Sequence, residues 1–354
     1  MKKIRLIFLF PLGLLYGIIT YFRRFLYKKN CFSSYKPPIK TICVGNIAVG
    51  GTGKTPHVEY LIRLLSTQYA VATLSRGYKR LTHGYISTFT TELPINALTI
   101  GDEPMQFHTH FPALPVAVCE KRKIGIESLL SENKNLDIIL LDDAFQHLAV
   151  QCGFNIVLTE FASPYFHDFP MPAGNLREFR TAAKSADIII VTKSPCNLSL
   201  AESEKYQENF TKQKKKSIFF TTYLYENPQP ITARAQEVPL HKNSPILLLT
   251  GIANPAPLQQ ELSKQFSNIE LITFNDHHLF TAKDIHLLQQ KYDETGDKNT
   301  VIMTTEKDAC RLLTNETKKR VSLLPIFSIP IKVEFLFEKE LLFNQIIQDY
   351  VGKN

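Results

Sequence analysis

The sequence predicts an α/β protein built on a parallel sheet with flanking helices. A membrane-associated helix is expected before this sheet, and a second, smaller α/β domain is expected after it. Short apolar runs alternate with helical periodicity along most of the chain, which is typical of a parallel sheet with crossover helices. The stretch GGTGKT follows the first such run, so the larger domain is expected to be P-loop NTPase-like. An uncharged apolar segment stands near the N-terminus.

The N-terminal segment is the first element of this prediction. Residues 6–22 carry no charge and are flanked by basic residues, but a helix that spans a bilayer needs ~20 apolar residues. Pro11, Gly13 and Gly17 weaken a spanning helix, and no signal-peptide cleavage site follows the run. We expect residues 1–30 to form a helix seated at a membrane, with its basic flanks at anionic headgroups. The alternative is a helix buried against the domain, and whether the helix spans stays open.

Two α/β domains are expected after this helix. The larger covers residues 31–225, with strands near 42–44, 70–74, 138–141, 156–159 and 188–191. A stretch rich in proline and polar residues near 226–244 is the predicted hinge linker. The smaller domain covers residues 226–354, with strands near 246–250, 269–274, 300–304 and 326–329 and helices near 256–266 and 281–292.

Composition limits the function classes. With 354 residues, of which 44% are hydrophobic and 21% charged, the chain is an ordinary globular protein. Its net charge of +8 favours an anionic partner, which could be nucleic acid, a phosphorylated small molecule or a membrane surface. The six cysteines show no metal-binding spacing, as expected for reduced thiols in a cytosolic compartment.

The phosphate loop carries the clearest chemistry. Its predicted nucleotide-binding residues are Ala48, Val49, Gly50, Gly51, Thr52, Gly53, Lys54 and Thr55. The glycines let backbone N–H groups curl around an anion, Lys54 can reach the phosphates, and the Thr55 hydroxyl can bind Mg²⁺. Ala48 stands where the usual pattern has glycine, but the three tightest positions keep theirs. The sequence therefore predicts a nucleotide site.

Two aspartates complete the predicted nucleotide site. The run 138–141 ends in Asp142 and Asp143, which places their carboxylates where Mg²⁺ of a P-loop protein is bound. Which of the two touches the metal stays open. The guanine-recognition pattern would need an aspartate at Pro195, so ATP is favoured over GTP.

Three further clusters indicate a substrate pocket, and two of them, LSRGYKR and NDHHLFT, each follow a predicted strand. LSRGYKR contains Arg76, GDEPMQF contains Asp102, and NDHHLFT contains His277 and His278. A kinase that acts on a hydroxyl needs a carboxylate or an imidazole near the nucleophile and cations around the phosphates. Each cluster alone is commonplace, but together at strand ends they indicate one site.

These motifs together resemble one family, tetraacyldisaccharide 4′-kinase, the lipid A 4′-kinase of Gram-negative bacteria. The likeness covers nearly the whole chain and includes VGNIAVGGTGKTP, LSRGYKR, GDEPMQF, LLDDAFQH, MPAGNLREF, LLLTGIANP, NDHHLFT and TTEKDACRL. A small residue other than glycine is usual in that family at the position of Ala48. The family's DDGFQ appears here with Ala144 in place of glycine.

The resemblance implies transfer of the γ-phosphate of ATP to the 4′-hydroxyl of tetraacyldisaccharide 1-phosphate, which forms lipid IVA. The implied cofactors are ATP and Mg²⁺, and the implied partners are the acylated glucosamine disaccharide 1-phosphate and inner membrane lipids, with no nucleic acid. The implied location is the cytoplasmic face of the bacterial inner membrane, with the protein peripheral or anchored by its N-terminal helix.

The resemblance also implies residue roles. Lys54 would stabilise the transferring phosphoryl group, and Thr55, Asp142 and Asp143 would hold Mg²⁺ directly or through its water shell. Asp102 would be the base for the 4′-hydroxyl, oriented by His277 or, slightly less favoured, by His278. The substrate or nucleotide contacts would include Arg76 and Arg177.

Two other classes share part of these features. A membrane-associated regulatory P-loop ATPase would explain the phosphate loop, the aspartates and the N-terminal helix, but not GDEPMQF or NDHHLFT. A nucleic-acid-dependent ATPase would use the positive charge, yet the sequence contains no basic-aromatic interleaving.

Overall fold

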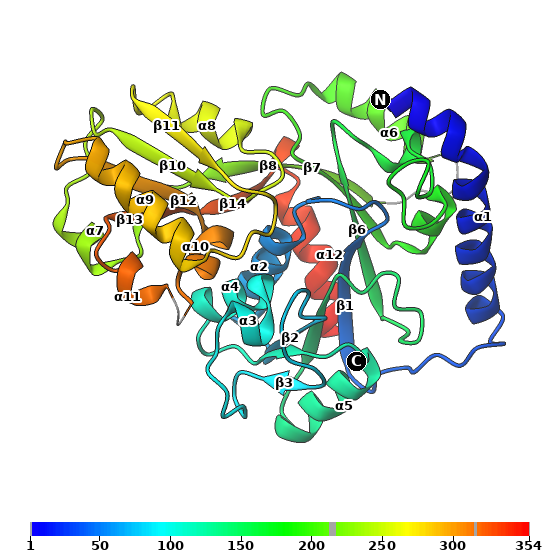
Figure 1. Ribbon diagram of the computed structural model, residues 1–354. Coiled ribbons are helices and arrows are strands. Elements are labelled where there is room, and N and C mark those ends of the chain that lie inside the picture. The colour runs from blue at the N-terminus through cyan, green and yellow to red at the C-terminus, as the bar shows by residue number, and fades with distance from the viewer. Residues whose placement is uncertain (1, 212–216, 315–316, 354) are drawn as a thin grey trace.

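The computed structural model describes residues 2–211, 217–314 and 317–353, with side chains from residue 7 onward. Its strands form two sheets, and a long helix, α1 (Lys2–Lys28), lies along one side of the molecule (Figure 1). The smaller sheet lies on the far side from α1, and helices α4 and α10 lie between the two sheets. The predicted α/β class is confirmed.

The larger sheet has the strand order β14-β8-β7-β6-β1-β5-β2-β4-β3. Its interior pairs are parallel, and the two edge strands, β3 and β14, are antiparallel to their neighbours. Its strands are β1 (Lys40–Asn46), β2 (Val71–Ser75), β3 (Ile86–Ser87), β4 (Val116–Val118), β5 (Ile138–Asp142), β6 (Phe154–Glu160), β7 (Ile188–Thr192), β8 (Ser217–Tyr225) and β14 (Ile331–Phe335). Around it lie α2 (Lys54–Leu65), α3 (Ala97–Ile100), α4 (Asp102–His110), α5 (Arg122–Glu132), α6 (Leu200–Thr211), α12 (Glu340–Gly352) and the 3₁₀ turns η1 (Tyr165–His167), η2 (Arg180–Ser185) and η3 (Leu336–Glu338).

Alternation along the central strands divides the core of this sheet into two layers. Ile42 and Val44 of β1 face the layer that contains α2 and α12, whereas Cys43 between them faces the layer that contains α5. Successive side chains of a strand point to opposite faces, so an unbroken apolar run is what a strand covered on both faces needs. The carboxyl ends of β1, β2 and β5 therefore meet at one edge, where the loops that they feed can share a site.

The smaller sheet has the order β11-β10-β12-β13-β9, parallel except for β9. Its strands are β9 (Gln229–Pro230), β10 (Ile246–Thr250), β11 (Ile269–Thr273), β12 (Val301–Thr305) and β13 (Ile326–Ile329). Its helices are α7 (Ala233–Glu237), α8 (Ala256–Leu262), α9 (Ala282–Glu294), α10 (Glu306–Leu312) and α11 (Lys318–Val321). The predicted strands of both sheets are present within a few residues of their expected bounds.

The organisation differs from the predicted ranges at two places. Residues 229–238 were expected to be hinge linker, but β9 is an edge of the smaller sheet and Ala235 and Val238 lie in its core. Residues 331–352 were expected in the smaller domain, but β14 pairs with β8 and α12 packs on the larger sheet through Phe343, Ile347 and Val351. The apolar faces of β14 and α12 match the larger sheet, so the chain crosses between the sheets twice, once before β9 and once after β13.

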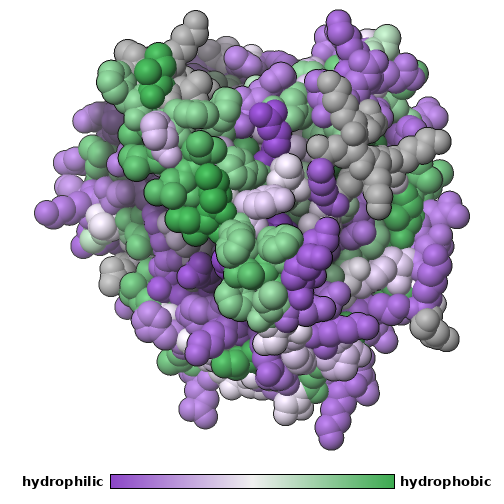
Figure 2. Space-filling view, turned by 90° about the vertical axis from the view of Figure 1, so that its right-hand side faces the viewer, coloured by the Kyte–Doolittle hydropathy of each residue, from purple (hydrophilic) through white to green (hydrophobic). Residues whose placement is uncertain are grey.

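Helix α1 is continuous through Pro11 and presents two faces. One face packs on residues 169–179, where Gly13 lies against Ala173 and Gly17 against the Phe179 ring. The other face is apolar and exposed, as the hydrophobic side chains in Figure 2 show. Residues 7–28 have the length and apolar composition of a helix that could cross a membrane, and little of this apolar stretch is buried in the protein. Helix α1 therefore packs on the protein along one face, and it is not a helix of the hydrophobic core.

Candidate active site

The phosphate loop connects β1 to α2 with the backbone that its glycines predict. Left-handed conformations fall on Gly50 (φ +120°) and Gly53 (φ +84°) and not on Ala48. Ala48 instead forms an antiparallel bridge with Leu176, which is ordinary extended geometry for a residue with a side chain. This explains why glycine is dispensable at the first position. At Gly53 a Cβ would lie 1.7 Å from the Tyr223 hydroxyl, so glycine is needed there.

Lys54 and the paired aspartates lie together beyond the end of β5. Lys54 Nζ is 3.7 Å from Asp143 Oδ1, and Arg177 Nη1 is 3.0 Å from both carboxylate oxygens of Asp143. Burial alone would raise the pKa of Asp143, but the charges of Lys54 and Arg177 hold this pKa below its ordinary value. Asp143 has a left-handed backbone (φ +46°), which is rare for aspartate and recurs at functional sites. Arg177, which the resemblance implies as a substrate or nucleotide contact, forms an ion pair with Asp143 here.

Asp142 offers an open ligand position. It is 3% exposed, and Ser75 Oγ donates to its Oδ2 at 3.3 Å. Its Oδ1 is buried and has no hydrogen-bond partner within the described part of the chain. Burial, together with the negative charges of Glu103 and Asp143, raises the pKa of Asp142 to about 7. A cation beside Oδ1 would supply the missing partner and restore the ionised form.

The donor set fits Mg²⁺ better than a metal caged by protein ligands alone. The described residues contain no group of three or more His, Cys, Asp or Glu side chains that could hold a metal. Mg²⁺ commonly binds one or two carboxylates and completes its shell with phosphate oxygens and water. Asp142 and Asp143, together with the half-buried Thr55 near the start of α2, are residues that could hold such a metal.

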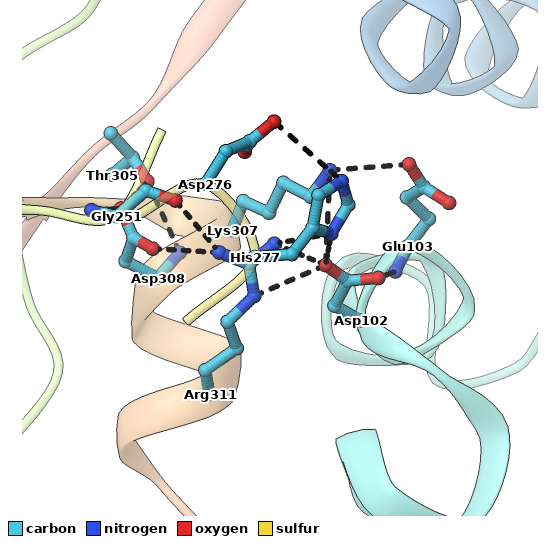
Figure 3. A network of polar contacts seen from close by, with 9 residues as sticks. All are labelled: Asp102, Glu103, Gly251, Asp276, His277, Thr305, Lys307, Asp308 and Arg311. Atoms are coloured by element: carbon cyan, nitrogen blue, oxygen red, sulfur yellow. Dashed lines mark hydrogen bonds and ion pairs between the residues drawn. The ribbon is translucent and has the colours of Figure 1, made fainter. Parts of the chain in front are cut away.

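A second polar network joins the two sheets (Figure 3). Asp102, the first residue of α4, lies 3.0 Å through its Oδ2 from His277 Nδ1. Arg311 of α10 donates to the same oxygen through Nε, at 3.1 Å, and through Nη2. Lys307 lies 3.7 Å from Asp102 and 3.2 Å from Glu103. The GDEPMQF and NDHHLFT clusters, 175 residues apart in sequence, therefore meet in space.

The electrostatics of this network keep Asp102 charged. Burial alone would raise the pKa of Asp102. The hydrogen bond from His277 and the charges of Lys307 and Arg311 outweigh burial and hold this pKa well below its usual range. His277 has a left-handed backbone (φ +60°), as Asp143 does. Asp102 is therefore an anion at neutral pH, and it points at an imidazole from the other unit. Each unit is one of the two sheets together with its helices.

The structure separates the two histidines of NDHHLFT. His278 Nε2 is 3.0 Å from Asp284 Oδ2, and Asp284 also accepts hydrogen bonds from Thr281 at the start of α9. The His278 ring stacks on Phe274 with centroids 4.6 Å apart. His278 thus contributes to the packing and capping of α9, and His277 alone of the pair contacts Asp102.

The buried guanidinium of Arg311 forms ion pairs with two carboxylates, those of Asp102 and Asp308. It is 1% exposed, and its Nη1 donates to Asp308 Oδ1 at 2.9 Å and to the carbonyl of Gly251 at 3.1 Å. Removing one partner of a buried ion pair leaves an uncompensated charge. We expect Arg311→Met to lower the free energy of unfolding by ~3 kcal/mol in urea titrations. Arg234→Met removes a largely exposed pair and should change it by less than ~1 kcal/mol; equal losses would contradict the assignment.

His110 forms a further bridge between the units. Its Nδ1 is 2.9 Å from Glu59 of α2 and its Nε2 is 2.9 Å from Glu306 of α10. Both nitrogens face carboxylates, so only the doubly protonated ring satisfies both. Burial alone would lower the pKa of His110, but the carboxylates of Glu306 and Glu59 raise this pKa to about 10.

This bridge predicts a pH-dependent stability. A pKa raised in the folded state adds stability that is fully present below the unfolded value of 6.5 and is lost as the pH rises toward 10. We expect wild type to lose on the order of 2 kcal/mol more than His110→Gln between pH 7 and pH 10. Urea unfolding at several pH values measures this difference, and parallel pH profiles for the two proteins would refute the bridge.

Positive charge collects around His147, four residues after Asp143, where Arg23, Arg76 and Arg122 are near enough to affect its pKa. Arg76 follows β2 and is exposed, and Arg122 is buried with its Nη2 3.2 Å from the carbonyl oxygen of Asp142. Burial and the charges of Arg122, Arg23 and Arg76 lower the pKa of His147 to about 4. This cluster of cations suits an anionic ligand.

Sequence reasoning assigned no role to Lys307, Arg311 or His110. The first two lie in TTEKDACRL directly after β12, so their place at a strand end was a usable signal. His110 lies at the last turn of a helix with no motif around it. Its role depends on Glu306, almost two hundred residues away in sequence, and no local pattern indicates that contact.

Comparison with known proteins gives consistent results. A family model described as Tetraacyldisaccharide-1-P 4'-kinase matches residues 5–351. A tetraacyldisaccharide 4'-kinase from Flavobacterium psychrophilum is 44% identical over 337 residues, which cover 94% of this chain and 95% of the relative. One from Bacteroides thetaiotaomicron is 38% identical over 357 residues, which cover 98% and 93%.

A solved structure extends the likeness to three dimensions. The crystal structure of the "apo" form of LpxK from Aquifex aeolicus in complex with ATP matches with a TM-score of 0.72 at 26% identity, covering 97% of this chain and 98% of that one. Sequence and fold agree over nearly the full length of both chains. The chain therefore belongs to the tetraacyldisaccharide-1-P 4'-kinase family.

Proposed function

We propose that this protein transfers the γ-phosphate of ATP to the 4′-hydroxyl of a tetraacyldisaccharide 1-phosphate, forming lipid IVA in lipid A biosynthesis. Family membership over residues 5–351 supports the activity. The observation that carries the mechanism is the 3.0 Å contact between Asp102 and His277, which come from different sheets. The negative charge of Glu103, which adjoins Asp102, contributes to the raised pKa of Asp142, so the start of α4 lies near the two aspartates at the end of β5.

The residues divide into a phosphate-binding group and an acceptor-activating group. Residues 48–55 would cradle the phosphates of ATP, and Lys54 would neutralise the charge that spreads over the transferring phosphoryl oxygens. Asp102 would accept the proton of the attacking hydroxyl, while His277 fixes the direction of the carboxylate. Closure of the two units over ATP would exclude water as a competing acceptor.

We propose Mg²⁺ as the metal, held by Asp142, Asp143 and the Thr55 hydroxyl. When bound, it neutralises phosphate charge and orients the transferring group. Two observations support this assignment: Asp142 has a buried carboxylate oxygen with no hydrogen-bond partner among the described residues, and the charges of Lys54 and Arg177 favour the ionised form of Asp143. Arg76, at the carboxyl end of β2, would contact substrate phosphate through the positive cluster described above.

The lipid character of the acceptor fits the exposed apolar face of α1. Ile7, Phe8, Leu15 and Ile19 are each more than half exposed on this helix, an arrangement that water disfavours and a bilayer accommodates. We therefore propose that the protein is seated by α1 on the cytoplasmic face of the inner membrane, in contact with membrane lipids, and that it binds no nucleic acid.

Lipid-dependent turnover tests the proposal. Purified protein is given ATP and Mg²⁺ in detergent micelles, with or without the acylated disaccharide 1-phosphate, and ADP release and lipid products are measured. We expect turnover to require the lipid and one ADP to form for each phosphorylated lipid. Turnover that is independent of the lipid, with no phosphorylated product, would instead identify a regulatory ATPase.

A further inference from the structure

Residues 169–180, which contain the MPAGNLREF motif, form a strap between helix α1 and the phosphate loop. On its outer side the strap receives α1 closely: a Cβ on Gly13 would lie 2.7 Å from Ala173 Cβ, and one on Gly17 would lie 2.5 Å from the Phe179 ring. Phe10 and Tyr21 make edge contacts with Phe169 and Phe179, at 5.9 and 6.5 Å between centroids. Small residues on α1 thus let the helix sit directly on the strap.

The inner side of the same strap holds the phosphate loop. Val49 N donates to the carbonyl of Asn175 at 2.8 Å, and Arg177 N donates to the carbonyl of Ile47 at 2.8 Å. Arg177 then reaches Asp143 through its side chain, at 3.0 Å. One strap of about ten residues therefore contacts α1, the phosphate loop and Asp143.

Arg24 of α1 fastens this arrangement. Its Nε and Nη2 donate to the two carboxylate oxygens of Glu178 at 2.6 and 2.8 Å, and the two side chains are only 17% and 5% exposed. Nη2 also donates to the carbonyl of Phe145 at 3.3 Å, and the guanidinium lies 4.9 Å from the centre of the Phe145 ring. Glu178 adjoins Arg177 in the strap, and Phe145 follows Asp143 by two residues.

We propose that Arg24 is a positioning residue, through which the docked α1 holds the strap, the phosphate loop and Asp143 in register for phosphoryl transfer. The inference rests on the proposed function and adds to it a mechanical link between the membrane-seated helix and the catalytic loop. The fork geometry of arginine matters here, because one guanidinium must reach a carboxylate and a carbonyl at the same time. Seating on lipid through the exposed face of α1 leaves this inner face in place.

The full chain tests this with substitutions at Arg24, at its partner Glu178 and at a control position. Arg24→Met removes the fork, Arg24→Lys keeps the charge without the fork, and Arg234→Met makes the same exchange at a largely exposed ion pair beside the smaller sheet. Each protein is assayed for kcat and KM with ATP and the acylated disaccharide 1-phosphate in micelles. Flotation on vesicles of anionic phospholipid, the melting temperature and amide exchange at Val49 and Arg177 are measured alongside.

We expect Arg24→Met to lower kcat at least tenfold and to speed exchange at the two amides, with flotation unchanged. Arg24→Lys should recover part of the loss, and Arg234→Met should match wild type. Glu178→Gln, which keeps the shape of the partner, should change kcat in the same direction and guards against misfolding of the first variant. Wild-type kcat per folded molecule in Arg24→Met, with normal exchange, would overturn the inference. Absence of phosphorylated lipid with the wild type would refute the proposed function instead.

Discussion

Replacing Lys54 with alanine is expected to lower kcat by on the order of 10³-fold while the protein stays folded. Lys54 is the only residue of the phosphate loop whose side chain carries a cation, and it lies 3.7 Å from Asp143. Charge on the transferring phosphoryl group is spread over its oxygens in the transition state, where a fixed cation stabilises it most. Loss of this cation should therefore affect kcat more than the KM for ATP.

The control for this variant is Lys332→Ala. Lys332 is paired with Glu226 on the surface and is 54% exposed, so its removal should leave kcat within about twofold of wild type. Initial rates of ADP release at saturating lipid, with circular dichroism to check folding, provide the measurement. A near-normal rate in Lys54→Ala would remove the phosphate loop from the mechanism.

Asp102→Asn is expected to reduce kcat by ~10³-fold and to leave ATP affinity nearly unchanged. Asparagine keeps the size of the side chain and loses the charge that accepts a proton. Because the pKa of Asp102 is held well below its usual range, the carboxylate is ionised throughout the neutral range, and wild-type kcat should show no titration of Asp102 above pH 5. Single-turnover rates and ATP binding by calorimetry separate the two effects.

His277 and Asp187 provide the comparison for that variant. His277→Gln should lower kcat less than Asp102→Asn does, because it removes the group that orients the base and not the base itself. Asp187→Asn changes a surface carboxylate that accepts a hydrogen bond from the Asn155 amide, and it should leave kcat unchanged. Loss of ATP binding in Asp102→Asn would move Asp102 to the metal-binding group.

The sequence predicts the parts of the site that follow directly from strand ends. GGTGKT after β1 and the aspartates after β5 lie where they were expected, because parallel strands deliver their carboxyl ends to one edge. The clusters that contain Asp102 and His277 were expected to share one site, but their direct pairing was expected only through the family resemblance, because no local pattern links individual residues 175 positions apart. Arg311 was missed for the same reason: its burial is created by the meeting of the two units.

The fold errors also have a physical cause. β14 and α12 carry apolar residues at the spacing typical of a strand and a helix. This spacing predicts that one face of each segment is buried, but it does not indicate which sheet covers that face. β14 lies directly after β13 in the chain yet pairs antiparallel with β8 of the other sheet. The proline-rich stretch that resembled a linker supplies a two-residue edge strand, too short to leave a periodic signal.

Transfer of a labelled γ-phosphoryl group tests the central claim most directly. The full-length protein is incubated with ATP labelled with ³²P at the γ-position and with tetraacyldisaccharide 1-phosphate, and the lipid is extracted and hydrolysed mildly to remove the 1-phosphate. We expect the label to stay with the disaccharide at the 4′-oxygen and Lys54→Ala and Asp102→Asn both to lose this labelled lipid. Label released only as inorganic phosphate, with unlabelled lipid, would contradict the account.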